Sequence, residues 1–173
     1  MTVSGQPIRR KEDLRFITGK GRYTDDVNLP DQCHAIFARS PVAHANITSI
    51  DTTVAAGMPG VRLVLTGTDY AKSALGTLIC GWMIHSKDGG EMKPGVHPPL
   101  ALEKVRYVGD PVAVVIADSR QMARDAAEMI DVEYEQLAAV VSLKNAAGHE
   151  SSVHNDVPGN VAFDWELGNK DET

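Results

Sequence analysis

Hydrophobic positions run without interruption through residues 112–117 (VAVVIA). A strand with one side in solvent would alternate apolar and polar residues, so this run predicts a central strand buried on both faces. Pro111 stands at its start, where a missing backbone N–H disrupts the ladder least. Gly109 and Asp110 before it are typical of a turn. We expect the fold to be organised around this strand.

The segment that follows has the pattern of an amphipathic helix. Asp118 or Ser119 can cap its first turn, and Gln121 stands three residues after Asp118, the spacing of a capping box. On such a helix Met122 and Ala126 share one face. The same apolar face is extended by Ala123, Ala127 and Ile130.

Shorter strands and helices are predicted on both sides of this unit. Alternating or apolar runs predict strands at residues 33–39, 45–50, 61–65 and 130–134, the last half exposed. Polar caps predict a short helix at residues 51–56 and a helix or turn at residues 66–72. Because these elements are interleaved along the chain, the sequence predicts mixed α and β structure rather than separate layers of each.

Four segments have weaker patterns. Residues 78–84 are apolar and are interpreted as a strand or a buried loop, whereas residues 86–99 are rich in glycine and proline and predict a long loop. One or two helical turns are expected at residues 142–147. Near the end, Phe163, Trp165 and Leu167 alternate with acidic residues, as in a strand. A strand starting there suggests that the sequence is part of something longer; a C-terminal edge strand is the alternative.

Composition excludes several classes of protein. The net charge of −6 and the 5% aromatic content argue against nucleic acid as a partner, because phosphate binding needs basic surface and base binding needs aromatic platforms. The sequence contains no apolar run of membrane-spanning length. Two cysteines, Cys33 and Cys80, make no disulfide framework, so we expect reduced thiols and a cytoplasmic protein.

Residues 8–23 form a basic, glycine-containing arm. Its cationic residues are Arg9, Arg10, Lys11, Arg15, Lys20 and Arg22. Such a run is either a contact for a partner or a solvated, extended segment, and from its charge alone the solvated segment is favoured. Gly19 and Gly21 do not make a phosphate loop, because no strand precedes them and no Lys-Ser/Thr pair follows.

No catalytic or metal-binding constellation is visible. The six histidines lack zinc-ligand spacing with each other and with the cysteines. No serine lies in a nucleophile elbow, and Ser40 with His44 is a weak hydrolytic candidate because a proline intervenes and no orienting acid is present. A dinucleotide-binding glycine pattern is also absent. The residues therefore indicate a fold but no active site.

Several short motifs, in order along nearly the whole chain, carry a family resemblance. They are residues 10–26 (RKEDLRFITGKGRYTDD), 29–30 (LP), 38–41 (ARSP), 43–45 (AHA), 59–61 (PGV), 64–67 (VLTG), 105–117 (VRYVGDPVAVVIA), 125–128 (DAAE), 132–135 (VEYE) and 158–162 (PGNVA). Together they resemble the start of the molybdopterin-binding large subunit of the xanthine dehydrogenase and aldehyde oxidase family. The carbon monoxide dehydrogenase type of large chain is the most similar.

The resemblance implies an α+β fold, the α/β hammerhead, with a mixed sheet, short helices and long loops. It implies that molybdopterin and the catalytic residues belong to downstream parts of a full-length subunit, with iron–sulfur clusters and flavin on partner subunits. No catalytic, cofactor-binding or metal-binding residue can be carried over to this chain, and two cysteines cannot ligate a four-cysteine cluster. We expect an oxidoreductase component that is inactive alone.

The resemblance also favours the basic arm as an interface element, because its motif is part of the match. The expected interface residues are Arg10, Arg15, Phe16, Arg22 and Trp165. Expected partners are the remainder of the large subunit and the iron–sulfur and flavin subunits, and a second copy is a candidate partner of the isolated chain.

The expected division is an arm at residues 1–22, a hammerhead at 23–148 and an extension at 149–173 that leads toward a molybdopterin-binding region. Two other interpretations stay open at this point. The chain could be a stand-alone binding or assembly module that keeps the hammerhead, or a small enzyme that uses its own acidic or histidine residues.

Overall fold

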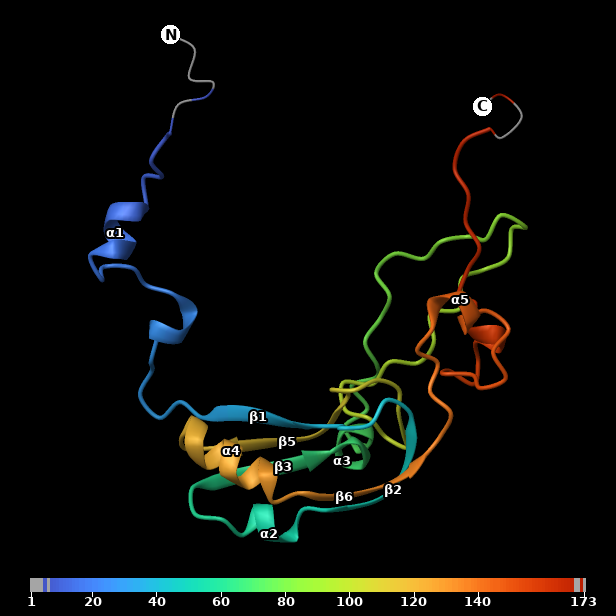
Figure 1. Cartoon of the computed structure of the whole chain (residues 1–173). Coiled ribbons are helices and arrows are strands. Elements are labelled where there is room, and N and C mark those ends of the chain that lie inside the picture. Colours follow the sequence, from blue (N-terminus) through green and yellow to red (C-terminus); the bar gives the residue numbers. More distant parts are fainter. Residues whose placement is uncertain (1–4, 6, 170–171, 173) are drawn as a thin grey trace. The chain divides into compact units, whose positions relative to one another are not determined.

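The computed structural model describes Gly5, residues 7–169 and Glu172 (Figure 1). The chain divides into two units, residues 1–32 and residues 33–173. The expected three-part division at residues 22 and 148 stays a prediction.

The first unit contains two short helical segments, α1 (Asp13–Ile17) and the 3-10 helix η1 (Thr24–Asp26). No residue of either segment is buried. The backbone N–H of Tyr23 donates to the Asp26 carboxylate at 2.8 Å, which closes the turn of η1. The arm therefore has local structure where the sequence pattern favoured an extended segment, and it is largely exposed.

The second unit is built on a three-stranded sheet with the order β1–β5–β3. The strands are β1 (His34–Arg39), β5 (Pro111–Ala117) and β3 (Val61–Thr66), and both pairings are antiparallel. The prediction that residues 112–117 form the central strand is confirmed.

One expectation about β5 is wrong. Ala113, Val115 and Ala117 are buried, but Val114 and Ile116, which alternate with them, are only partly buried. One face of the sheet is therefore covered, and the opposite face is not.

The covered face packs against α4 (Arg120–Glu128) and α2 (Thr53–Ala56). The Ser119 hydroxyl caps α4 by accepting a hydrogen bond from the backbone N–H of Met122 at 3.2 Å. The expected capping box is not formed, because the Gln121 side chain donates to Asp125 instead, at 2.6 Å. The core under the helix contains Ala55, Val115, Ala117, Ala123 and Ala126.

A second antiparallel sheet has the order β4–β2–β6. It consists of β4 (Lys104–Val105), β2 (Ala45–Asp51) and β6 (Asp131–Gln136). Along β6 partly buried and exposed residues alternate, as the sequence predicted. A second buried cluster, made of Ala45, Ala101, Val105 and Val112, lies where β5 meets this sheet.

Helix α3 (Gly67–Lys72) begins with a capping box between Thr66 and Asp69. Hydrogen bonds from Thr66 lower the pKa of the Asp69 carboxyl. Gly67 is buried so closely against the backbone of Ala101 that a Cβ at this position would collide with the Ala101 carbonyl.

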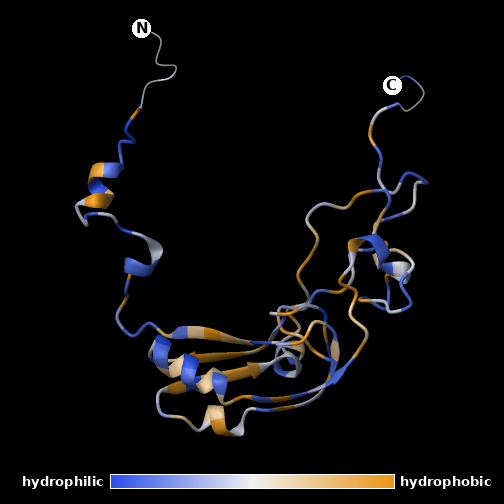
Figure 2. Ribbon diagram, viewed as in Figure 1, coloured by the Kyte–Doolittle hydropathy of each residue, from blue (hydrophilic) through white to orange (hydrophobic). Residues whose placement is uncertain are grey.

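The remaining helical segments are α5 (Leu143–Ala146) and the 3-10 helix η2 (Pro158–Asn160). Residues 78–84 form neither a strand nor a buried loop, and residues 163–167 do not form a strand. Figure 2 shows apolar segments both along the strands and in the irregular stretch between α3 and β5. The predicted α+β class with short helices and long loops is confirmed; the sheet is divided in two, and all four pairings of the described strands are antiparallel.

Candidate docking surface

The segment between α3 and β4 makes a long loop, defined here as residues 77–97. Its two limbs are joined by backbone hydrogen bonds from Leu78 to the His97 carbonyl at 2.8 Å and from Met92 to the Ile84 carbonyl at 3.1 Å. A tight turn at its tip has the backbone N–H of Ser86 donating to the Gly90 carbonyl at 2.8 Å. The loop thus has a defined path although it contains no strand of a sheet.

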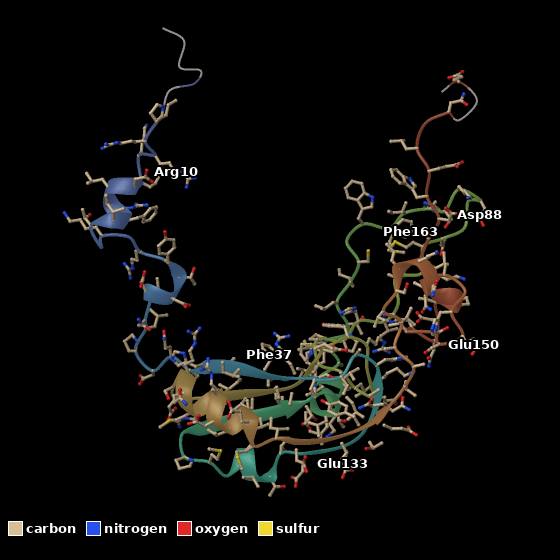
Figure 3. The ribbon with its side chains drawn as sticks, in the orientation of Figure 1. Arg10, Phe37, Asp88, Glu133, Glu150 and Phe163 are labelled. Carbon is tan, nitrogen blue, oxygen red and sulfur yellow. The ribbon has the colours of Figure 1, made fainter. Side chains whose placement is uncertain are left out.

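Residues 161–167, named here the C-terminal segment, run alongside this loop and are hydrogen-bonded to it. The backbone N–H of Lys93 donates to the Ala162 carbonyl at 2.9 Å, and that of Lys87 donates to the Asp164 carbonyl at 2.7 Å. The Lys87 ammonium also pairs with the Asp164 carboxylate at 2.6 Å, and this pairing raises the pKa of Lys87. Asp88 and Phe163 mark the two stretches in Figure 3.

Large apolar side chains on both stretches are exposed. On the long loop, Ile79 and Trp82 have 90% and 80% of their surface exposed. On the C-terminal segment, Phe163, Trp165 and Leu167 are also exposed. Folded monomers rarely leave such side chains together in solvent, and a patch of this kind usually marks a surface for another protein.

A cavity of about 510 Å³ lies between the limbs of the long loop. Its lining includes Leu78, Ile79, Met83, Met92, Pro94 and Val96. Methionine and aliphatic side chains adapt easily to an inserted apolar group. The cavity can therefore accept an apolar side chain from a partner.

The base of the long loop is fixed by histidine packing. The ring of His97 lies 6.4 Å from the rings of both Tyr107 and His154. Gly95 has a φ of 73°, and a Cβ there would meet the His154 ring at 2.6 Å. Burial, and then the nearby Arg106 guanidinium, lower the pKa of His154. Among the described residues its buried Nδ1 has no hydrogen-bond partner, and this position therefore disfavours the charged ring.

A second groove of about 620 Å³ lies beside the base of the loop, next to α3 and β4. Apolar groups such as Leu102 and Pro98 line it together with Lys104 and Arg106. The two cations are engaged locally: Lys104 donates to Asn155 at 3.4 Å and Arg106 donates to the Val153 carbonyl at 3.2 Å. These two hydrogen bonds attach Val153 and Asn155 to the body of the domain.

The basic arm contributes a separate cluster in the first unit. The Arg15 guanidinium lies 4.9 Å from the centre of the Phe16 ring, and Phe16 stacks on Tyr23 at 5.3 Å. Gly21 passes so close to Phe16 that a Cβ would lie 2.6 Å from its ring. Of the predicted interface residues, the structure therefore joins Arg15 with Phe16.

Within the described part of the chain, no contact of the other predicted interface residues with this stack is seen. Arg10 precedes α1, and Arg22 lies between Gly21 and Tyr23; both are exposed. Trp165 belongs to the C-terminal segment and is exposed. Sequence reasoning placed Leu78 and Ile79 in a strand or buried loop and so missed their exposure. The glycine and proline residues that follow, with no pairing strand in reach, were the available signal.

The described residues do not fit a resident metal centre. Among them no group of three or more histidine, cysteine or acidic side chains could hold a metal ion. Both cysteines are unpaired thiols on the surface. Side chains of the described region therefore supply no ligand set for molybdenum or for an iron–sulfur cluster. Within that region, helices of the length and apolarity needed to cross a membrane are also absent.

Comparison with known proteins gives one consistent result. Residues 18–138 match the family model described as aldehyde oxidase and xanthine dehydrogenase, a/b hammerhead domain. The chain is 40% identical to the nicotine 6-hydroxylase large subunit of Paenarthrobacter nicotinovorans, over 93% of this chain and 19% of that protein.

Solved structures agree. Quinoline 2-oxidoreductase from Pseudomonas putida 86 has a TM-score of 0.74 and 39% identity, over 90% of this chain and 19% of that one. The Cu,Mo-CO dehydrogenase has a TM-score of 0.67 and 39% identity, over 84% of this chain and 17% of that one. The chain spans about a fifth of the length of these relatives.

Proposed function

Because the chain belongs to the aldehyde oxidase and xanthine dehydrogenase family, whose a/b hammerhead domain it contains, we propose that it is a structural and assembly domain of a molybdenum hydroxylase large subunit. In this proposal, oxidoreductase chemistry belongs to polypeptide outside these residues. The isolated chain is expected to be inactive.

The cofactors follow from the same proposal. Molybdopterin would be held by the full-length subunit, and iron–sulfur clusters and flavin by partner subunits. Support comes from the relatives, one of which is a large subunit and another a Cu,Mo enzyme.

The observation that carries the proposal is the uncovered apolar surface of the long loop and the C-terminal segment. These stretches have a defined backbone path but leave Trp82 and Trp165 in solvent. We assign the long loop and the C-terminal segment to contacts with the remainder of the large subunit and with the iron–sulfur and flavin subunits. In isolation the same surface would attract a second copy of the chain.

The basic arm would be a second contact. Its Arg15–Phe16–Tyr23 stack presents a cation and two rings on a small, exposed unit, with Arg10 and Arg22 nearby in sequence. Arginine with aromatic residues is a common composition of interface anchors. The division into an arm, a hammerhead at residues 23–148 and an extension belongs to this proposal, as does a cytoplasmic location.

The test is a binding experiment with three variants of the 173-residue chain. The probe is the large subunit of Paenarthrobacter nicotine 6-hydroxylase without the region that matches this chain, together with its partner subunits. Trp165→Ser and Arg15→Glu should each weaken co-purification with the probe. Leu143→Ser is the control, because Leu143 is an exposed leucine on α5 outside both proposed contacts.

Light scattering of each variant alone shows whether it remains monodisperse. If Trp165→Ser and Arg15→Glu stay folded and bind as well as the parent chain, the proposed contacts are wrong. If the parent chain itself does not bind, the assembly role fails.

A further inference from the structure

The sheet β1–β5–β3 has one face that no described part of its unit covers. Strand residues alternate between the two faces of a sheet. Ile36, Val64 and Val115 pack on the side of α4, so their neighbours in sequence lie on the other side. There Val114 and Ile116 remain partly exposed, although they belong to an unbroken apolar run that is typical of a doubly buried strand.

The register of the strands arranges this uncovered side into two rows. Ile116 lies between Ala35 on β1 and Leu63 on β3, and Val114 lies between Phe37 and Leu65. The side chains of Phe37 and Leu63 each have 44% of their surface exposed. The open face is defined here as Ala35, Phe37, Leu63, Leu65, Val114 and Ile116; Phe37 is labelled in Figure 3.

Two arginines of these strands, Arg39 and Arg62, lie at the ends of the open face, and both are already engaged. At one end the Arg39 guanidinium lies 5.6 Å from the Phe37 ring and donates to the Gly109 carbonyl at 2.8 Å. At the other end Arg62 pairs with Asp118 at 2.6 Å. The two rows between them consist of apolar side chains, so the group that covers them must be apolar and uncharged.

The size of the open face decides what kind of partner fits. A whole aromatic side chain buries roughly 150–250 Å², so six small or partly exposed side chains offer a few hundred Å² at most. A stable complex of two free proteins buries about 800 Å² on each partner. The open face alone is therefore too small to hold a second copy.

A tethered segment has no such requirement, because the tether raises its effective concentration to about the millimolar range. The relatives of this chain are about five times longer than the part it matches. We propose that in the full-length large subunit the open face is covered by an apolar, uncharged segment of the same polypeptide, outside residues 1–173. This inference rests on the proposed assembly function and adds a contact that is distinct from the long loop.

The experiment co-expresses the 173-residue chain with the truncated large subunit of nicotine 6-hydroxylase and measures the complex recovered. Phe37→Glu and Leu63→Glu would each place an unpaired carboxylate under the covering segment. Burying an unpaired carboxylate against apolar side chains is strongly unfavourable, so recovery should fall at least about tenfold. Val54→Glu is the matched control, because Val54 is 54% exposed and lies on α2, which packs on the opposite side.

All three variants should melt like the parent chain, since each changes a side chain that is already about half in solvent. A second measurement does not depend on a charged variant. In a Cys33→Ser, Cys80→Ser background, Phe37→Cys should react with iodoacetamide in the isolated chain and become protected in the complex.

The outcomes separate this inference from the assembly role. If Phe37→Glu and Leu63→Glu bind like the parent while Trp165→Ser does not, the open-face inference is overturned and the assembly role stands. Loss of binding by the parent chain would overturn both. A concentration-dependent dimer in sedimentation that Phe37→Glu abolishes would show that a second copy covers the face, which also overturns the inference.

Discussion

The core under α4 and the long loop contain similar apolar residues but use them in opposite ways. Val115 is fully buried between β1, β3 and the helix, whereas Trp82, on the long loop, is 80% exposed. The core has neighbours on every side from within the same unit, and the loop has backbone hydrogen bonds but few covering side chains. The core therefore stabilises the domain, and the exposure of the loop is the basis for the proposal that it makes contacts with other polypeptide.

The largest expected effect is in the core. Val115→Asp would bury an unpaired carboxylate at a cost of several kcal/mol, comparable to a domain's whole stability of roughly 5–15 kcal/mol. We expect the cooperative melt to be lost in circular dichroism. Val114→Asp on the open face is the matched control and should keep a melt, because water still reaches that side chain. Equal loss in both variants would mean that the two faces of β5 do not differ.

A smaller effect is expected where α3 meets the body. In Gly67→Ala the new Cβ would collide with the Ala101 carbonyl, so the backbone must shift, at a cost of about 1–3 kcal/mol. Gly57→Ala is the control, because Gly57 has a φ of −83° and a Cβ there would meet its neighbours at an ordinary 3.6 Å. Chemical denaturation should show a lower free energy of unfolding for Gly67→Ala only. An unchanged value would place α3 outside the packed body.

A local, pH-dependent effect is expected at the base of the long loop. The pKa of His154 is lowered in the folded state, so the unfolded chain binds the proton more tightly. The packing of His154 at the base of the loop therefore contributes its full stability above a pH of about 6.5, and this contribution is lost as the pH falls below that value. The charged and titratable groups that act on His154 are His97, Arg106, Asp110 and Asp156.

Hydrogen exchange, corrected for the intrinsic effect of pH, should show the base of the loop opening more often at pH 5 than at pH 7.5. His154→Gln should reduce this dependence, and His85→Gln, near the tip of the loop, should leave it intact. If the base of the long loop opens equally often at both pH values, the role given to His154 is wrong.

Sequence patterns predicted most of the body because its elements are decided locally. The apolar run of β5 and the capping residue Ser119 were both read from short stretches, and the structure confirms them. The errors arose where the structure of a segment depends on a partner elsewhere in the chain, such as a strand that pairs with it. Residues 78–84 and 163–167 are apolar enough for strands, yet no described strand pairs with them.

The uncovered side of β5 is an error of the same kind. Apolarity on both sides of a strand predicts a cover on both sides but cannot say whether the same unit provides it. The arm residues were predicted to be interface residues only through the family resemblance, because charge in an arm is equally typical of solvated segments, and they stay a prediction. The contact of the Arg15 guanidinium with the Phe16 ring could not be predicted from the sequence, because adjacency in the chain does not determine how two side chains are oriented.

The claim that the long loop is a contact surface is tested most directly by its amide exchange in two states. The measurement compares peptides from residues 77–97 in the isolated chain with the same peptides when the chain is bound to the truncated large subunit and its partner subunits. The account predicts that these peptides exchange more slowly in the complex than in the isolated chain, while peptides from β5 do not change. Equal exchange of the loop in the two states would contradict it.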